Sequence, residues 1–106
     1  VHIGTTAENL KAAIAGEEYE RDVMYPAFIK DAEAQANTPA IRTFQWALEA
    51  EAEHARMYSD ALKHIDKQRT RTIFYVCIVC GYTTDDQDMM RCPVCNTPKE
   101  KFEKIE

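Results

Sequence analysis

Cys77-Ile78-Val79-Cys80 and Cys92-Pro93-Val94-Cys95 are two C-x-x-C turns, separated by 11 residues, and they hold all four cysteines of the chain. In such a turn both sulfur atoms can face one ion while backbone N–H groups point at the thiolates. Two disulfides are the alternative, but cysteines confined to 77–95 suit a metal site in a reducing compartment better than a set of cross-links. The pattern predicts a cytoplasmic protein whose metal ligands are Cys77, Cys80, Cys92 and Cys95.

The sequence around these turns is typical of a small module of strands and turns. Thr72-Ile73-Phe74-Tyr75-Val76 is rich in β-branched and aromatic residues, and Gly, Asp and Pro punctuate the rest of the module. We expect one domain at 72–106, too short to fold without its ion. Tetrahedral coordination by four thiolates suits zinc or iron. Zinc would make the module a structural ribbon, and iron would make it a one-electron carrier.

Residues 1–68 have the pattern of a helical hairpin. Thr5-Thr6-Ala7-Glu8 is a capping box, which predicts a helix over about 6–36. Thr38 is expected to cap a second helix, with Pro39 at its first position, that runs to about 65. Pro26 lies inside the first helix, where it removes one hydrogen bond and should bend the helix. The predicted fold class is therefore α with a small β part, divided at 1–68 and 72–106.

Both helices carry carboxylates where their helical spacing requires core residues. The stripe on the first helix is interrupted by Glu17 and Glu20, and the stripe on the second by Glu51, with His54 one turn further on. A single Glu in such a stripe usually reaches water at its edge. Two interruptions, each midway along its helix, would cost several kcal/mol if buried unpaired, so a cation between the helices is the economical explanation. Di-iron four-helix bundles use two E-x-x-H motifs and one Glu from each of two further helices.

Charge and hydropathy exclude two classes of partner. Residues 1–68 carry 7 basic and 12 acidic side chains, and residues 69–106 carry 6 of each. Nucleic-acid binding needs a basic patch, and the only basic run, 67–71, is interpreted as a solvated linker. No apolar run approaches the roughly 20 residues of a membrane span. We therefore expect neither nucleic acid nor membrane as a partner.

Taken in order, these motifs resemble the second half of a rubrerythrin, over nearly all 106 residues. The resemblance implies the second half of a ferritin-like four-helix bundle followed by a rubredoxin-like ribbon. The matching segments are Ala15-Gly16-Glu17-Glu18-Tyr19-Glu20, Met24-Tyr25-Pro26, Glu51-Ala52-Glu53-His54, Cys77-x-x-Cys80-Gly81-Tyr82 and Cys92-Pro93-x-Cys95, ending in Pro98 and Phe102.

The same resemblance implies a role for each candidate site residue. Glu17 and Glu51 would be iron ligands, with Glu51 bridging, and His54 would bind the same iron as Glu17. Glu20 would be a mobile carboxylate that binds the other iron in the oxidised state. Tyr25 would donate a hydrogen bond to a ligand carboxylate, and the four cysteines would hold a rubredoxin-type iron, for which zinc could substitute.

The implied activity is that of a non-haem di-iron peroxidase in oxidative-stress defence. It would reduce hydrogen peroxide to water with electrons from the rubredoxin-type iron, and finally from NAD(P)H through a rubredoxin or an NAD(P)H-dependent rubredoxin reductase. The alternative is a non-enzymatic electron-transfer or structural zinc-ribbon module on a dimerising hairpin.

One part of the family pattern is missing from this sequence. A rubrerythrin has a preceding helix pair with its own Glu and E-x-x-H. We therefore expect the di-iron centre to be shared with another hairpin, which is either a complementary N-terminal half or a second copy in a homo-oligomer.

Overall fold

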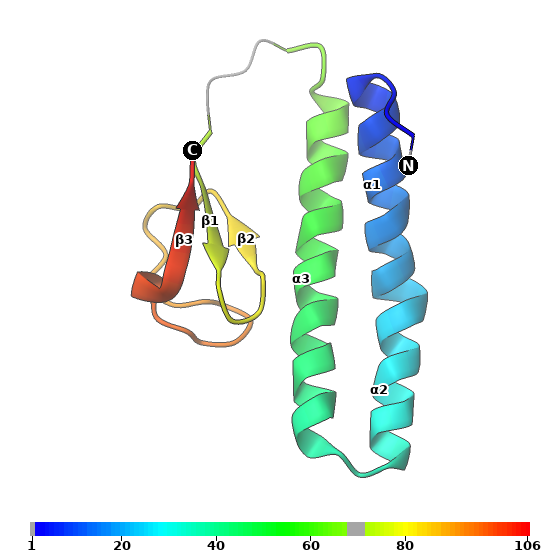
Figure 1. Cartoon of the computed structure of the whole chain (residues 1–106). Helices are drawn as coiled ribbons and strands as arrows, with labels where there is room; N and C mark the ends of the chain where they lie inside the picture. The colour runs from blue at the N-terminus through cyan, green and yellow to red at the C-terminus, as the bar shows by residue number, and fades with distance from the viewer. Residues whose placement is uncertain (1, 68–71) are drawn as a thin grey trace.

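A computed structural model describes residues 2–67 and 72–106 of the chain. It contains a long helical hairpin followed by a three-stranded antiparallel sheet, as the sequence predicted (Figure 1). The helical elements are α1 (Thr6–Tyr19), the π turn η1 (Glu20–Met24), α2 (Tyr25–Ala34), α3 (Thr38–Lys63) and the short 3₁₀ helix η2 (Lys99–Lys101). The strands are β1 (Phe74–Cys77), β2 (Thr83–Thr84) and β3 (Phe102–Ile105).

The helix starts follow from local side-chain chemistry. At the start of α1 the Thr5 hydroxyl accepts from the backbone N–H of Glu8 at 3.2 Å, and the Glu8 carboxylate accepts from the N–H of Thr5 at 3.2 Å. This is the predicted capping box. The cap of α3 differs from the prediction by one residue, because Asn37 and not Thr38 accepts from the N–H of Ala40, at 3.2 Å. Asn is as good a cap as Thr, and the choice lets Thr38 enter the helix.

Pro26 is accommodated by the π turn that lies just before it. The N–H of Tyr25 donates to the carbonyl of Glu20, five residues earlier, where an α-helix would use a carbonyl four residues earlier. Pro26 has no N–H to donate, and in a regular helix its ring would clash with the carbonyl of Asp22. The wider turn relieves this conflict, so the helix continues as α2 beyond Pro26.

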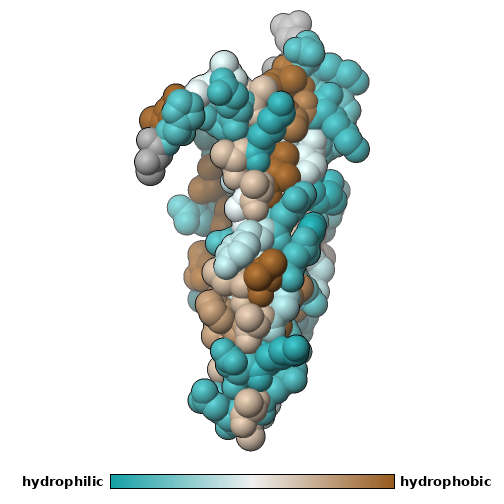
Figure 2. All heavy atoms as spheres, turned by 90° about the vertical axis from the view of Figure 1, so that its right-hand side faces the viewer, coloured by the Kyte–Doolittle hydropathy of each residue, from teal (hydrophilic) through white to brown (hydrophobic). Residues whose placement is uncertain are grey.

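The hairpin packs without burying a large side chain. Its only buried residues among those described are Ala32, Ala50 and Ala55. Tyr19 and Val23, by contrast, are more than half exposed. Figure 2, which faces the α1 and α2 side, shows apolar areas interspersed among hydrophilic ones. Two helices alone have therefore not enclosed a core.

The sheet holds the two cysteine turns together. Strand β1 lies in the middle, with β2 and β3 antiparallel on either side, and Cys77 at the end of β1 pairs with Phe102. Cys77 and Cys92 are almost fully buried. The centre of this small module is therefore made of cysteine rather than of aliphatic side chains.

The sheet packs beside the middle of α3, on the side away from α1 and α2 (Figure 1). Strand β2 makes the contact with α3. Within residues 2–67 and 72–106, no helix has both the length and the apolar character needed to cross a bilayer.

Candidate metal centres

The four cysteines meet as free thiols around one point. One sulfur atom from each lies within 4.8 Å of the others, and the Cys77–Cys95 and Cys80–Cys92 sulfur pairs are each 3.6 Å apart. A disulfide would need about 2.05 Å. Around an ion with metal–sulfur bonds of about 2.3 Å, tetrahedral geometry separates the sulfurs by about 3.8 Å. The sulfur positions therefore fit one tetrahedral ion of the zinc or iron class.

The two cysteine turns have the same backbone pattern. In the first, the N–H of Gly81 donates to the carbonyl of Cys77 at 2.9 Å, and in the second, the N–H of Asn96 donates to that of Cys92 at 2.9 Å. The residue after the second cysteine of each turn, Gly81 or Asn96, has a positive φ, of 84° and 66° respectively. Gly and Asn are the residues that tolerate this left-handed geometry best.

Burial works against ionisation of these thiols when no metal balances them. It raises the pKa of Cys80 and Cys92 above the ordinary value. Burial also raises the pKa of Cys95, but hydrogen bonds from Thr97 and from the neighbouring cysteines outweigh it and lower the pKa to about 7. Four thiolates at this site therefore call for a bound cation.

The second cluster lies between the helices and joins three of the predicted residues. Glu17 from α1 and Glu51 and His54 from α3 each place one ligand atom within 4.8 Å of the others. Nδ1 of His54 is 3.2 Å from Oε2 of Glu51 and 3.6 Å from Oε2 of Glu17. All three side chains are largely buried: the exposed fraction is 24% for His54, 16% for Glu51 and 17% for Glu17.

Glu17 has an unsatisfied oxygen in this cluster. Its Oε2 atom is buried and has no hydrogen-bond partner among the described residues. An orphaned carboxylate oxygen beside a second carboxylate is unfavourable unless a cation joins them. Two carboxylates and one imidazole are suitable ligands for iron, so the cluster fits half of a di-iron site.

The other ring nitrogen of His54 contacts the four-cysteine module of residues 72–106, called the ribbon below. Nε2 lies 3.0 Å from the carbonyl oxygen of Gly81 and 3.2 Å from the hydroxyl oxygen of Thr83. A carbonyl only accepts, so Nε2 is the donor in this contact. Nδ1 is the ring nitrogen that faces the cluster, where it could bind a metal. Because Gly81 directly follows Cys80, a single imidazole joins the two candidate metal centres.

The structure does not bring the other predicted site residues into the cluster. Glu20 is half-buried at the start of the π turn, and its carboxylate is not among the three grouped ligands. The Tyr25 ring packs against Phe28 and Phe44, at centroid distances of 5.9 and 6.3 Å, and within the described chain its hydroxyl makes no hydrogen bond. The roles of Glu20 and Tyr25 stay predictions. Glu53, two residues after Glu51, lies outside the cluster, and its carboxylate pairs with Arg56 at 2.6 Å.

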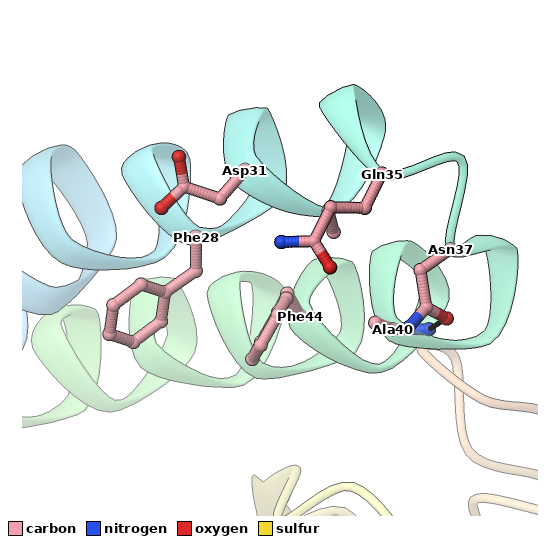
Figure 3. Close-up of a pocket in the computed structure, with 7 residues that line it drawn as sticks. Phe28, Asp31, Gln35, Asn37, Ala40 and Phe44 are labelled. Carbon is pink, nitrogen blue, oxygen red and sulfur yellow. Dashed lines mark hydrogen bonds between the residues drawn. The ribbon is translucent and has the colours of Figure 1, made fainter.

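Two hollows flank the hairpin. One of about 430 Å³ lies between hairpin and ribbon beside His54 and Thr83, and its other walls are mostly apolar. The other, of about 320 Å³, lies at the hairpin turn, where Phe28 and Asp31 of α2 approach Phe44 of α3 (Figure 3). Asp31 is the only carboxylate among the described residues that line it, and the two groups of His, Cys, Asp and Glu ligands found in the described chain lie elsewhere.

Sequence reasoning missed three residues that contact the candidate ligands. The carbonyl of Gly81 and the hydroxyl of Thr83 contact His54, and the hydroxyl of Thr97 lies 2.9 Å from the sulfur of Cys95. The contacts of Gly81 and Thr83 with His54 join residues that are far apart in the sequence, so no local pattern indicates them. Thr97 lies only two residues after Cys95. Aligning the two C-x-x-C turns with each other would have marked this position as one that lies beside a cysteine.

Comparison with known proteins places both regions in one family. The family model described as rubrerythrin matches residues 1–62, and the one described as the rubrerythrin rubredoxin-like domain matches residues 75–103. Rubrerythrin-2 of Clostridium acetobutylicum is 41% identical over 91% of this chain and 53% of its own length. Nigerythrin of Nitratidesulfovibrio vulgaris is 39% identical over 89% of this chain and 46% of its own length.

A solved structure shows the same arrangement. Nigerythrin in a state described as fully reduced and all ferrous superposes with a TM-score of 0.91 at 35% identity, over 99% of this chain and 52% of the nigerythrin chain. A helical hairpin carrying a Glu and an E-x-x-H, followed by a four-cysteine ribbon, defines a class of two-centre metalloprotein. The chain belongs to the rubrerythrin family. It spans about half the length of the curated relatives that it matches.

Proposed function

We propose that this chain supplies half of a di-iron site and a complete rubredoxin-type iron site to a peroxidase that reduces hydrogen peroxide to water. The observation that carries the proposal is the position of His54, whose Nδ1 faces Glu17 and Glu51 while its Nε2 contacts the ribbon next to Cys80. The division into a hairpin domain, 1–68, and a ribbon domain, 72–106, belongs to this proposal, since the hairpin would supply half of the di-iron site and the ribbon would hold the other centre.

The residues of the hairpin would hold the iron pair. Glu17 and Glu51 would provide carboxylate oxygens, Glu51 to both irons, and His54 would provide Nδ1; these three ligand atoms already lie within 4.8 Å of one another. When bound, a ferrous pair supplies the two electrons that, with two protons, convert one hydrogen peroxide molecule into two water molecules. Glu20 lies one helical turn after Glu17, close enough along the helix to act as the additional, movable carboxylate. Tyr25 is proposed to orient a ligand carboxylate once the bundle is complete.

The ribbon would deliver electrons one at a time. Cys77, Cys80, Cys92 and Cys95 would hold its iron, and the contact from His54 to the Gly81 carbonyl joins the ribbon to the hairpin. After each transfer, the iron of the tetrathiolate site would be reduced again by a rubredoxin or an NAD(P)H-dependent rubredoxin reductase. A reducing compartment such as the cytoplasm would keep all four thiols free for metal.

A second hairpin has to complete the iron pair. One copy of this chain groups a single Glu and a single E-x-x-H motif, whereas the four-helix recipe needs two of each. The uncovered apolar side chains of α1 and α2 support the same conclusion. The second hairpin is a complementary N-terminal half or another copy of this chain.

The alternative is a zinc ribbon on a hairpin with no redox activity. The sulfur geometry suits zinc as well as iron, which is the observation in its favour. Ferric tetrathiolate is red and the zinc site is colourless, so the visible spectrum of the protein as isolated separates the two functions.

The direct test of the proposed function is single-turnover oxidation. Iron-loaded protein, with a complementary helix pair if the chain does not self-associate, is reduced without oxygen and mixed with one equivalent of hydrogen peroxide. We expect rapid return of the red absorption in the wild type and in Glu49→Ala, an exposed glutamate on the same helix. Glu51→Ala should return at least about tenfold more slowly, because a ligand is lost. Equal rates in all three proteins would contradict the proposal.

A further inference from the structure

The two cysteine turns are matched in backbone but differ in one side chain. At the second position after the turn, the carbonyl of Tyr82 accepts from the N–H of Cys77 at 2.9 Å, and that of Thr97 accepts from the N–H of Cys92 at 2.8 Å. Burial raises the pKa of Cys80 and of Cys95, and backbone hydrogen bonding from Tyr82 and from Thr97, respectively, opposes that rise. Tyr82 and Thr97 are therefore equivalent positions of a local two-fold arrangement.

Only the second turn adds a side-chain hydrogen bond to this arrangement. The hydroxyl oxygen of Thr97 lies 2.9 Å from the sulfur of Cys95, and Thr97 is half-buried. A sulfur bound to a metal is a thiolate and has no proton to donate, so the hydroxyl must be the donor in the loaded protein. Cys95 thus receives two hydrogen bonds from one residue, whereas Tyr82 gives Cys80 only its backbone N–H.

We propose that Thr97 is a positioning residue whose hydroxyl raises the reduction potential of the tetrathiolate centre through Cys95. The inference rests on the proposed function to the extent that iron occupies the four cysteines. One-electron reduction of a ferric tetrathiolate adds one negative charge to the site, and the sulfurs share that charge. A hydrogen-bond donor aimed at a sulfur stabilises the reduced state more than the oxidised state, which raises the potential.

The test is the reduction potential of iron-loaded Thr97→Val, measured by spectroelectrochemistry. Valine keeps the branched shape and the backbone N–H of threonine and removes the hydroxyl alone. We expect the equilibrium constant for reduction to fall by about tenfold, which is about 59 mV for a one-electron couple. The sulfur-to-iron charge-transfer bands should move to lower energy, because an unbonded thiolate is the better electron donor. Thr97→Ser keeps the hydroxyl and should restore both values to those of the wild type.

The equivalent position in the other turn gives a reciprocal test. Tyr82→Thr places a hydroxyl beside Cys80, and its potential should exceed that of Tyr82→Val, which has the same shape without the hydroxyl. This pair decides the matter if Thr97→Val fails to load iron. Equal potentials for Thr97→Val and Thr97→Ser in loaded protein, or for Tyr82→Thr and Tyr82→Val, would overturn the proposal.

The same measurements in a Glu51→Ala background separate this inference from the peroxidase proposal. That variant lacks a ligand of the helical site but keeps all four cysteines. A shift that persists there supports the role of Thr97 whether or not the protein reduces peroxide. A shift that disappears there would contradict an effect transmitted through Cys95.

Discussion

Nε2 of His54 lies 3.0 Å from the carbonyl oxygen of Gly81, so a residue of the helical hairpin donates a hydrogen bond to the cysteine ribbon. The contact fixes which ring nitrogen of His54 is left for a metal. His64, at the C-terminal cap of the same helix, uses the other ring nitrogen for its backbone contact. Its Nδ1 lies 2.9 Å from the backbone carbonyl oxygen of Asp60. The two histidines are therefore expected to differ in tautomer.

This difference is measurable by nitrogen NMR. In protein with one equivalent of zinc at the cysteines, Nε2 of His54 should carry a proton, whereas neutral His64 should carry its proton on Nδ1. His64 serves as the internal control because it is exposed and outside both metal centres. A His54 whose Nε2 carries no proton would contradict the hydrogen bond to Gly81.

Loss of one cysteine should unfold the ribbon and leave the hairpin helical. Cys80→Ser removes one of four thiolates, and we expect metal affinity at the site to fall by more than about 100-fold, because even supporting residues change it by up to that factor. The folded ribbon depends on its ion, so its dispersed NMR signals should collapse while the helical circular dichroism remains.

The matched control is Ile78→Ser in the same turn. Ile78 is exposed and supplies no ligand, so this variant should keep its metal and its fold. A Cys80→Ser protein that retains a full complement of tightly bound metal would show that the four-cysteine assignment is wrong.

The fold was predictable because the residues that start, stop or turn its elements act locally. The Thr5 and Glu8 capping box, Pro39 and the two cysteine turns each impose structure within a few residues, and the helices begin and end within about two residues of the expected positions. The π turn before Pro26 was not predictable. It depends on how the whole helix relieves one steric conflict, and the sequence shows only that a conflict exists.

The ligand cluster was partly predictable for the same reason. Glu51 and His54 are one turn apart on one helix, so their spacing alone placed them together, and the interrupted stripe indicated Glu17. The absence of Glu53 from the cluster was also predictable, because Glu53 is two residues from Glu51 and residues two apart on a helix do not face each other. The contact of His54 with Gly81 joins residues 27 positions apart, in the hairpin and in the sheet region, and no sequence periodicity indicates it.

The hairpin should not hold an iron pair as a monomer. Sedimentation velocity of the chain with and without ferrous iron is expected to show either iron-dependent self-association or no iron bound between the helices until a complementary helix pair is added. The reason is that one copy groups only one Glu and one E-x-x-H motif. A folded monomer with two irons bound at residues 17–54 would refute this expectation.

The central claim is that one chain carries two chemically distinct iron environments, one of sulfur and one of carboxylate and imidazole. Mössbauer spectroscopy of ⁵⁷Fe-loaded protein, assembled with its complementary hairpin where one is needed, tests it most directly. We expect two components, one with tetrathiolate parameters and one with oxygen and nitrogen ligation, with Glu51→Ala losing only the second and Glu49→Ala losing neither. A single tetrathiolate component in the wild type, or a second component that survives Glu51→Ala unchanged, would contradict the account.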